Sequence, residues 1–92
     1  MTVFAIIRQP GSNGENLAEV IAKMYPDADY DLGSGAWLVS DSATAKDVSD
    51  KLNISDGING SAIVLEVASY FGRANPAIWS WIKAKWERPP VG

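Results

Sequence analysis

The sequence contains no cysteine and no histidine. Without cysteine the chain has no disulfide bond and no thiolate nucleophile, and without histidine it lacks the side chain that most often acts as a general base or a zinc ligand. These two absences exclude most hydrolase mechanisms and the usual zinc sites. We therefore expect no metal site, no cofactor and no catalytic residue, and the composition favours a binding protein over an enzyme.

Long hydrophobic runs are also missing. The longest uninterrupted ones, residues 3–7 and 62–65, are far shorter than the ~20 apolar residues that a membrane-spanning helix needs. The first residues do not have the charged and then apolar pattern of a signal peptide. From these features we expect no membrane partner and a cytoplasmic location.

Positive charge is in short supply as well. Eight Lys and Arg stand against 11 Asp and Glu, which gives a net charge of -3. Domains that bind nucleic acids usually carry an excess of basic residues, so we do not expect a nucleic-acid partner. The chain has 92 residues, of which 47% are hydrophobic and 21% charged. This balance predicts a single globular domain over residues 1–92.

The hydrophobic pattern predicts four strands and three helices. β-branched and aromatic residues indicate strands over residues 2–8, 27–32, 36–40 and 61–70. Helical periodicity indicates amphipathic helices over residues 15–25 and 44–52, the second capped by Thr44 with Asp47 three residues later and an Asp47–Lys51 pair along it. Asn75 followed by Pro76 is the cap and first-turn pair of a last helix over residues 76–87.

This order of elements predicts an α+β fold of the ferredoxin-like βαββαβ type, with an extra C-terminal helix rich in tryptophan. In this arrangement the first strand lies between the third and the fourth in an antiparallel four-stranded sheet. The two crossover helices cover one face of the sheet and leave the other to the extra helix, to water or to another chain. We expect Val64, Ala68 and Tyr70 on that second face.

Four short segments in the first part of the chain carry a pattern found in a known family. They are Ala5-Ile6-Ile7, Tyr30-x-Leu32 before a short turn, Trp37-Leu38-Val39 and the capped helix over residues 44–52. With these segments, residues 2–70 resemble small ferredoxin-like proteins of the VapD and CRISPR-associated ribonuclease type. The resemblance implies a nuclease in which an Asp near the end of the first strand holds a divalent cation. Here Ile7-Arg8-Gln9 occupies that place without a carboxylate, and an Arg there repels the cation.

The loop after the first strand is a candidate anion site. This loop leads into the first helix, the loop at Ser42 leads into the second, and we expect both at the same end of the sheet. Two helix N-termini and one guanidinium could hold a phosphate or a nucleotide. A turn that merely permits positive φ is the alternative. The predicted set is Arg8, Gly11, Ser12, Asn13, Gly14 and Ser42.

The aromatic residues indicate a contact surface. Four tryptophans are many for 92 residues, and an indole ring contributes a large area to an interface. Helical spacing turns Ile78, Trp79 and Trp86 inward and places Trp81 on the flank of the last helix. We therefore expect Trp81 and Tyr70 near a contact between two copies of the chain.

Three functions remain open at this point. The favoured one is a non-catalytic protein-interaction domain, either a homodimer or a binder of another protein, such as an accessory or inhibitor protein of a mobile element or defence system. The second is a nuclease-like enzyme, for which Asp41 and Glu66 are the best remaining carboxylates. The third is a regulatory module that binds a small anion or a nucleotide at Arg8.

Overall fold

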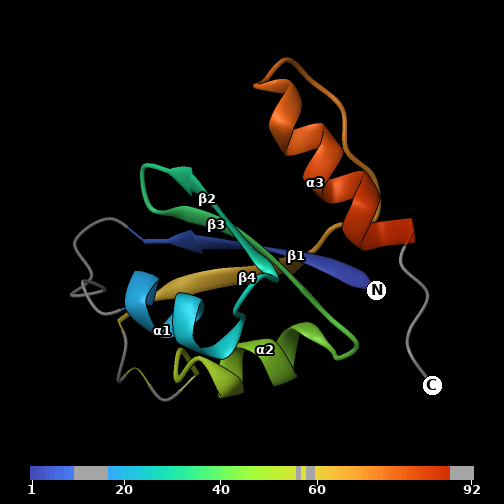
Figure 1. The fold of residues 1–92 in the computed structure, drawn as a ribbon. Coiled ribbons are helices and arrows are strands. Elements are labelled where there is room, and N and C mark those ends of the chain that lie inside the picture. Colours follow the sequence, from blue (N-terminus) through green and yellow to red (C-terminus); the bar gives the residue numbers. More distant parts are fainter. Residues whose placement is uncertain (10–16, 56, 58–59, 88–92) are drawn as a thin grey trace.

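The described residues form a four-stranded antiparallel sheet with three helices (Figure 1). The computed structural model describes residues 1–9, 17–55, 57 and 60–87. Its elements are β1 (Thr2–Arg8), α1 (Leu17–Met24), β2 (Asp29–Gly33), β3 (Ala36–Asp41), α2 (Ala45–Lys51), β4 (Ala62–Glu66) and α3 (Pro76–Glu87). The sheet order is β2-β3-β1-β4, so β1 lies between β3 and β4, as expected from the sequence. The predicted α+β class and the tryptophan-containing C-terminal helix are confirmed.

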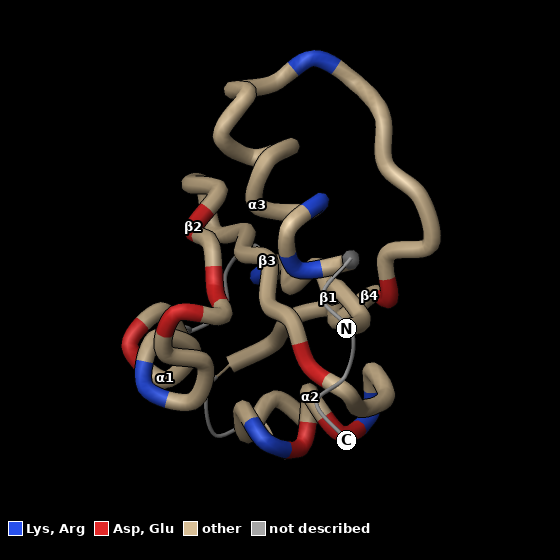
Figure 2. The backbone as a smooth tube through the Cα atoms, turned by 45° about the vertical axis from the view of Figure 1, so that its right-hand side comes forward, with Lys and Arg blue, Asp and Glu red and all other residues tan. Residues whose placement is uncertain are grey.

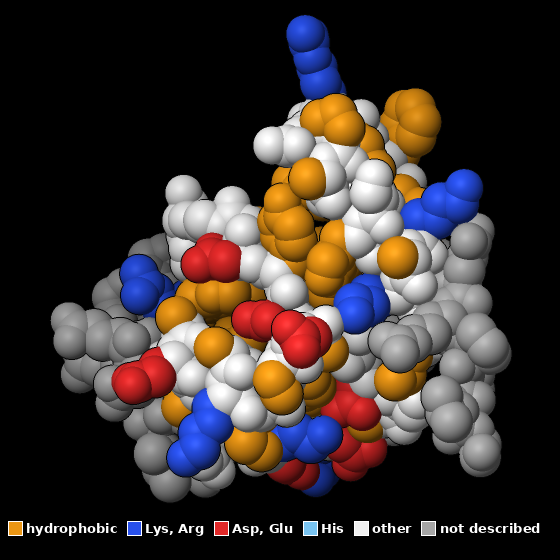
Figure 3. Space-filling view, in the orientation of Figure 1, with side chains coloured by type: hydrophobic (Ala, Val, Ile, Leu, Met, Phe, Trp, Pro, Cys, Tyr) orange, Lys and Arg blue, Asp and Glu red, His pale blue; other side chains and the backbone are white. Residues whose placement is uncertain are grey.

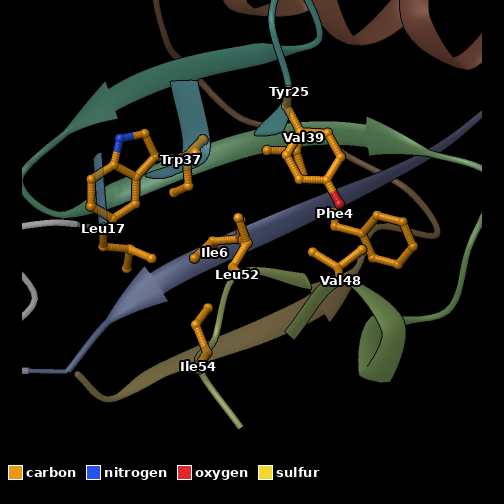
Figure 4. Packing of buried hydrophobic residues seen from close by; sticks show 10 residues of the cluster. Phe4, Ile6, Leu17, Tyr25, Trp37, Val39, Val48, Leu52 and Ile54 are labelled. Atoms are coloured by element: carbon orange, nitrogen blue, oxygen red, sulfur yellow. The ribbon is translucent and has the colours of Figure 1, made fainter. Parts of the chain in front are cut away.

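The main core lies between the sheet and the helices α1 and α2. Strand alternation turns Phe4 and Ile6 of β1 to this side, where they meet Leu17 and Ile21 of α1 and Val48 of α2. All five side chains are fully buried, and each contributes about 1.5–3 kcal/mol through the apolar surface that it removes from water. The other members of the cluster are Tyr25, Trp37, Val39, Leu52 and Ile54 (Figure 4).

The start of α2 is fixed by the predicted cap. The backbone N–H of Asp47 donates to Thr44 Oγ1 at 3.2 Å, and the N–H of Thr44 donates to Asp47 Oδ2 at 3.2 Å. This reciprocal pair satisfies two backbone donors that the helix cannot use itself. The predicted pair of Asp47 with Lys51 is replaced, because Lys51 lies beside the end of β3 and binds Asp41, while Lys46 and Asp50 form the i,i+4 pair.

The second face of the sheet is packed against α3. Val3, Leu38 and Ile82 are buried between them. The side chains of Ile78, Trp79 and Trp86, which the sequence pattern turned inward, pack against this cluster but remain half-buried. The first turn of α3 lies farther from the sheet than its last turns (Figure 1). A small second core therefore forms, and it occupies only part of this face.

The strand β4 is shorter than predicted. It ends at Glu66, and the N–H of Val67 donates to the carbonyl of Val3 at 2.9 Å before the chain leaves the sheet to reach α3. The predicted assignment of faces is wrong, because Val64 packs against the α1 and α2 core. Ala68 and Tyr70 come after the end of the strand, so strand alternation no longer places them on a common face with Val64.

The remaining elements lie within two residues of their predicted bounds wherever the chain is described. The predicted start of the first helix at residue 15 lies outside the described residues. Within residues 1–9, 17–55, 57 and 60–87, no helix combines the length and the apolar character needed to cross a lipid bilayer.

Candidate interaction surface

The part of the second face that α3 leaves uncovered is apolar. Ile7, Ile63 and Leu65 are 40%, 44% and 48% exposed. Ile7 lies directly opposite Ile63 in the register of β1 with β4, and Leu65 is two residues further along the same strand. Because alternate residues of a strand share one face, these three side chains form one contiguous area, which we call the open patch. Contiguous apolar areas on a protein surface often mark binding sites.

A second apolar area flanks α3. The ring of Tyr70 stacks on Trp79 with centroids 5.6 Å apart and an interplanar angle of 17°, and it also contacts Trp86 at 5.3 Å. Phe71 is fully exposed. Tyr70, Phe71, Gly72 and Trp79 line an open hollow of about 230 Å³. Figure 3 shows that hydrophobic side chains gather along α3 and where α3 meets the sheet.

Trp81 lies on the opposite flank of α3, toward β2. Its ring meets Tyr30 edge-on, with centroids 6.0 Å apart and planes at 62°. Lys85 Nζ lies 5.9 Å from the Trp81 ring and donates to the carbonyl oxygen of Asp27 at 2.7 Å. These contacts attach α3 to the β2 side of the same chain. The predicted role of Trp81 in a contact between two copies stays a prediction.

The two edges of the sheet differ in their ability to accept another strand. Figure 2 shows acidic residues along the edge strand β2, which carries Asp29 and Asp31. The pairing of β2 with β3 is irregular between Asp31 and Gly33. Charges and irregular pairing of this kind discourage the addition of a further strand. The other edge strand, β4, has the sequence AIVLE, with Glu66 at its end as its one charge. The β4 edge is therefore the one suited to pairing.

The structure separates the two halves of the predicted anion site. Thr2 is paired with Asp41 and Ile7 with Ala36, so Ser42, which follows Asp41, lies at the beginning of β1. The expectation that both loops share one end of the sheet is therefore wrong. The reason is topological, because the loop after a strand antiparallel to β1 must lie where β1 begins.

Arg8 lies at the other end of β1, beside the turn between β2 and β3. Its backbone N–H donates to the carbonyl of Gly35 at 2.8 Å. A Cβ atom at Gly35 would lie 3.5 Å from the Arg8 side chain, and Gly35 has a φ of +80° that favours glycine. The predicted site residues Gly11, Ser12, Asn13 and Gly14 lie outside the described residues.

The carboxylate of Asp41 is held by three donors. Its Oδ2 accepts hydrogen bonds from the Tyr25 hydroxyl at 2.8 Å and from Lys51 Nζ at 2.9 Å, and its Oδ1 accepts one from the N–H of Ser42 at 2.7 Å. Burial raises the pKa of Asp41, but these hydrogen bonds and the charge of Lys51 outweigh it and leave the pKa below its ordinary value. Asp41, at the end of β3, thus links Tyr25, which directly follows α1, to Lys51 at the end of α2.

The same cluster changes the chemistry of Tyr25. Burial, the hydrogen bond to Asp41 and the negative charge of that carboxylate all raise the pKa of the Tyr25 phenol. Lys51 Nζ also lies 5.1 Å from the centre of the Tyr25 ring. The hydroxyl therefore stays protonated over the physiological range and acts as a donor that positions Asp41.

Asp41 and Glu66 are the two carboxylates that the sequence analysis named for a nuclease-like enzyme. Asp41 is engaged by its donors, and Glu66 is exposed at the end of β4. In the described part of the chain, no group of three or more acidic side chains lies close enough together to hold a metal ion.

Sequence reasoning did not single out Ile7, Ile63 or Leu65 as surface residues. Apolar residues in a strand usually indicate a core, and only the position of α3 decides which of them it covers. The available signal in the sequence was the alternation of side chains along β4, which places Ile63 and Leu65 on the same face of the strand. Comparisons of the chain with models of protein families, with curated proteins and with solved structures found no match.

Proposed function

We propose that this protein is a non-catalytic interaction domain that acts as a homodimer. The observation that carries the proposal is the open patch, whose three apolar side chains lie on the edge strand β4 and on the neighbouring strand β1. Burial of apolar surface is the main driving force of stable protein association. The open patch offers such surface in a place where the fold itself leaves it uncovered.

A second copy of the chain is the partner that fits this surface best. In a symmetric dimer the same area of both subunits forms the contact, so an apolar area meets an apolar area without any further requirement. The net charge of -3 is moderate, and the open patch itself contains no charged residue that would repel its copy. Both features favour self-association.

The test compares two substitutions of exposed apolar residues. Leu65→Lys places a charge in the open patch, whereas Met24→Lys places one on α1, where Met24 is 43% exposed. We expect Leu65→Lys to raise the dimer dissociation constant about tenfold or more and Met24→Lys to leave it unchanged within about threefold, as measured by light scattering over a dilution series. Equal effects of the two substitutions, or a monomeric parent protein, would contradict the proposal.

A further inference from the structure

We propose that two copies join along their β4 edges in antiparallel register centred on Val64, which extends the sheet from four strands to eight. This inference rests on the proposed homodimer and names the surface that forms it. Four observations carry it: the direction of the free backbone groups, the position of the open patch, the position of the one charge in β4 and the contrast between the two sheet edges.

The backbone groups of β4 are divided between the two sides of the strand. The N–H of Gln9 donates to the carbonyl of Ser61, and the N–H of Val67 donates to the carbonyl of Val3. Residues that exchange hydrogen bonds with a neighbouring strand alternate along a strand, so residues 61, 63, 65 and 67 face β1. The N–H and carbonyl groups of Ala62, Val64 and Glu66 therefore point to the outer side of the sheet, where a further strand would bind them.

Val64 is the middle residue of β4, and a twofold axis there pairs the whole strand with its copy. Val64 would exchange two hydrogen bonds with the partner's Val64. Ile63 would lie opposite the partner's Leu65 as a pair without hydrogen bonds, in which side chains approach most closely. Both residues belong to the open patch, so each Ile63 side chain would pack beside the partner's Leu65 and cover part of both open patches on the α3 side of the joined sheet.

The charge in β4 also favours this register. With Val64 at the centre, Glu66 lies opposite the partner's Ala62, and the two carboxylates are at opposite ends of the paired strands. A register centred on Glu66 would place the two carboxylates directly opposite each other, which is destabilising, and would leave most of each strand unpaired.

The opposite edge of the sheet does not offer the same possibility. On β2 the acidic residues Asp29 and Asp31 would face acidic residues of a second copy, and the irregular pairing near Gly33 disturbs the ladder. The β2 edge is protected against pairing with another strand and the β4 edge is not. This contrast indicates that a second copy pairs at β4.

The first arm of the test removes the outward donor. Val64→Pro deletes the N–H that points away from β1, and proline is tolerated in an edge strand at such a position. The control Val64→Ala truncates the same side chain further than proline does but keeps the donor. We expect Val64→Pro to raise the dimer dissociation constant about 10- to 100-fold through the loss of two hydrogen bonds and the bulk of the ring, and Val64→Ala by less than about threefold. Circular dichroism checks that both variants remain folded.

The second experiment measures the register of the paired strands directly, and it can be carried out even if Val64→Pro does not fold. Because the chain has no cysteine, the substitutions Ile63→Cys and Leu65→Cys introduce the only thiols. Opposite residues without hydrogen bonds have Cα atoms about 4.5 Å apart, which suits a disulfide bond. We expect an equimolar mixture of the two variants to form the mixed disulfide at least about tenfold faster than either variant forms a disulfide with itself under mild oxidation.

The outcomes separate this inference from the proposed function. A parent protein that is dimeric, with Val64→Pro as dimeric as Val64→Ala, or with no preference for the mixed disulfide, would overturn the β4 register while the homodimer stands. A parent protein that remains monomeric at ~100 µM would overturn both.

Discussion

Ile7 and Ile63 lie directly opposite each other in β1 and β4, and both remain more than a third exposed. On the same face of β1, four residues earlier, Val3 is fully buried under α3. One face of one strand is therefore covered at its beginning and open at its end. Ile82 in the second half of α3 packs on the covered end, whereas the first turn of α3 lies farther from the sheet (Figure 1). The uncovered end of β1 contributes Ile7 to the open patch, on which the proposed dimer is based.

The cluster around Asp41 predicts a loss of stability in acid. The pKa of Asp41 is lowered in the folded chain, so its contribution is present above the unfolded pKa and is lost as the pH falls through the folded pKa. We expect the difference in unfolding free energy between the parent protein and Asp41→Asn to shrink below about pH 4. Urea denaturation at a series of pH values measures it. A difference that stays constant down to about pH 2 would contradict this role of Asp41.

The hydroxyl of Tyr25 predicts the opposite behaviour in alkali. Its pKa is raised in the folded chain, so its contribution is complete below about pH 10 and is lost as the pH rises further. At neutral pH, Tyr25→Phe should lower the unfolding free energy by about 1–2 kcal/mol, because the hydroxyl donates to a carboxylate. Urea denaturation at about pH 7 and about pH 11 tests this. If the effect of Tyr25→Phe is as large at the higher pH, the hydrogen bond is not its cause.

The cap of α2 predicts a selective effect at Thr44. Thr44→Ala removes the acceptor of the Asp47 N–H and should lower the unfolding free energy by about 1 kcal/mol. Thr44→Ser keeps an oxygen at the same place and should cost only a few tenths of that. Chemical denaturation of both variants provides the comparison, and the cap would be unimportant if the two variants had equal stability.

The half-buried Trp81 and the fully exposed Phe71 should differ in their effect on folding. Trp81→Ala removes the contact with Tyr30 that attaches α3 to β2 and should lower the unfolding free energy by about 2 kcal/mol. Phe71→Ala changes a fully exposed side chain and should stay within about 0.5 kcal/mol of the parent protein. Thermal and urea unfolding of both variants measure the contrast. The reverse order of stability would show that α3 is attached in another way.

The sequence was most informative where local physics decides the structure. The cap at Thr44 and the start of α3 at Pro76 depend on neighbouring residues, and both were predicted correctly. The end of β4 at Glu66 was not predicted, because Val67 has a residue type that favours strands. The chain leaves the sheet there to reach α3, and the position of α3 depends on the whole fold. The pairing of Lys51 with Asp41 was missed for the same reason, since the two residues belong to different elements.

The candidate surface depends even more on the arrangement in space. Arg8 and Ser42 were placed together from the order of elements alone, and the antiparallel register separates them. Strand alternation places Ile63 and Leu65 on one face, but only the position of α3 shows that this face is the open one.

Sedimentation velocity of the parent protein over a dilution series tests the homodimer most directly. The chain has a mass of 9.9 kDa. We predict that the weight-average mass approaches twice this value at ~100 µM protein and falls toward the monomer mass on dilution, as a dissociation constant in the micromolar range requires. A mass that stays at 9.9 kDa up to ~100 µM would contradict the proposed function.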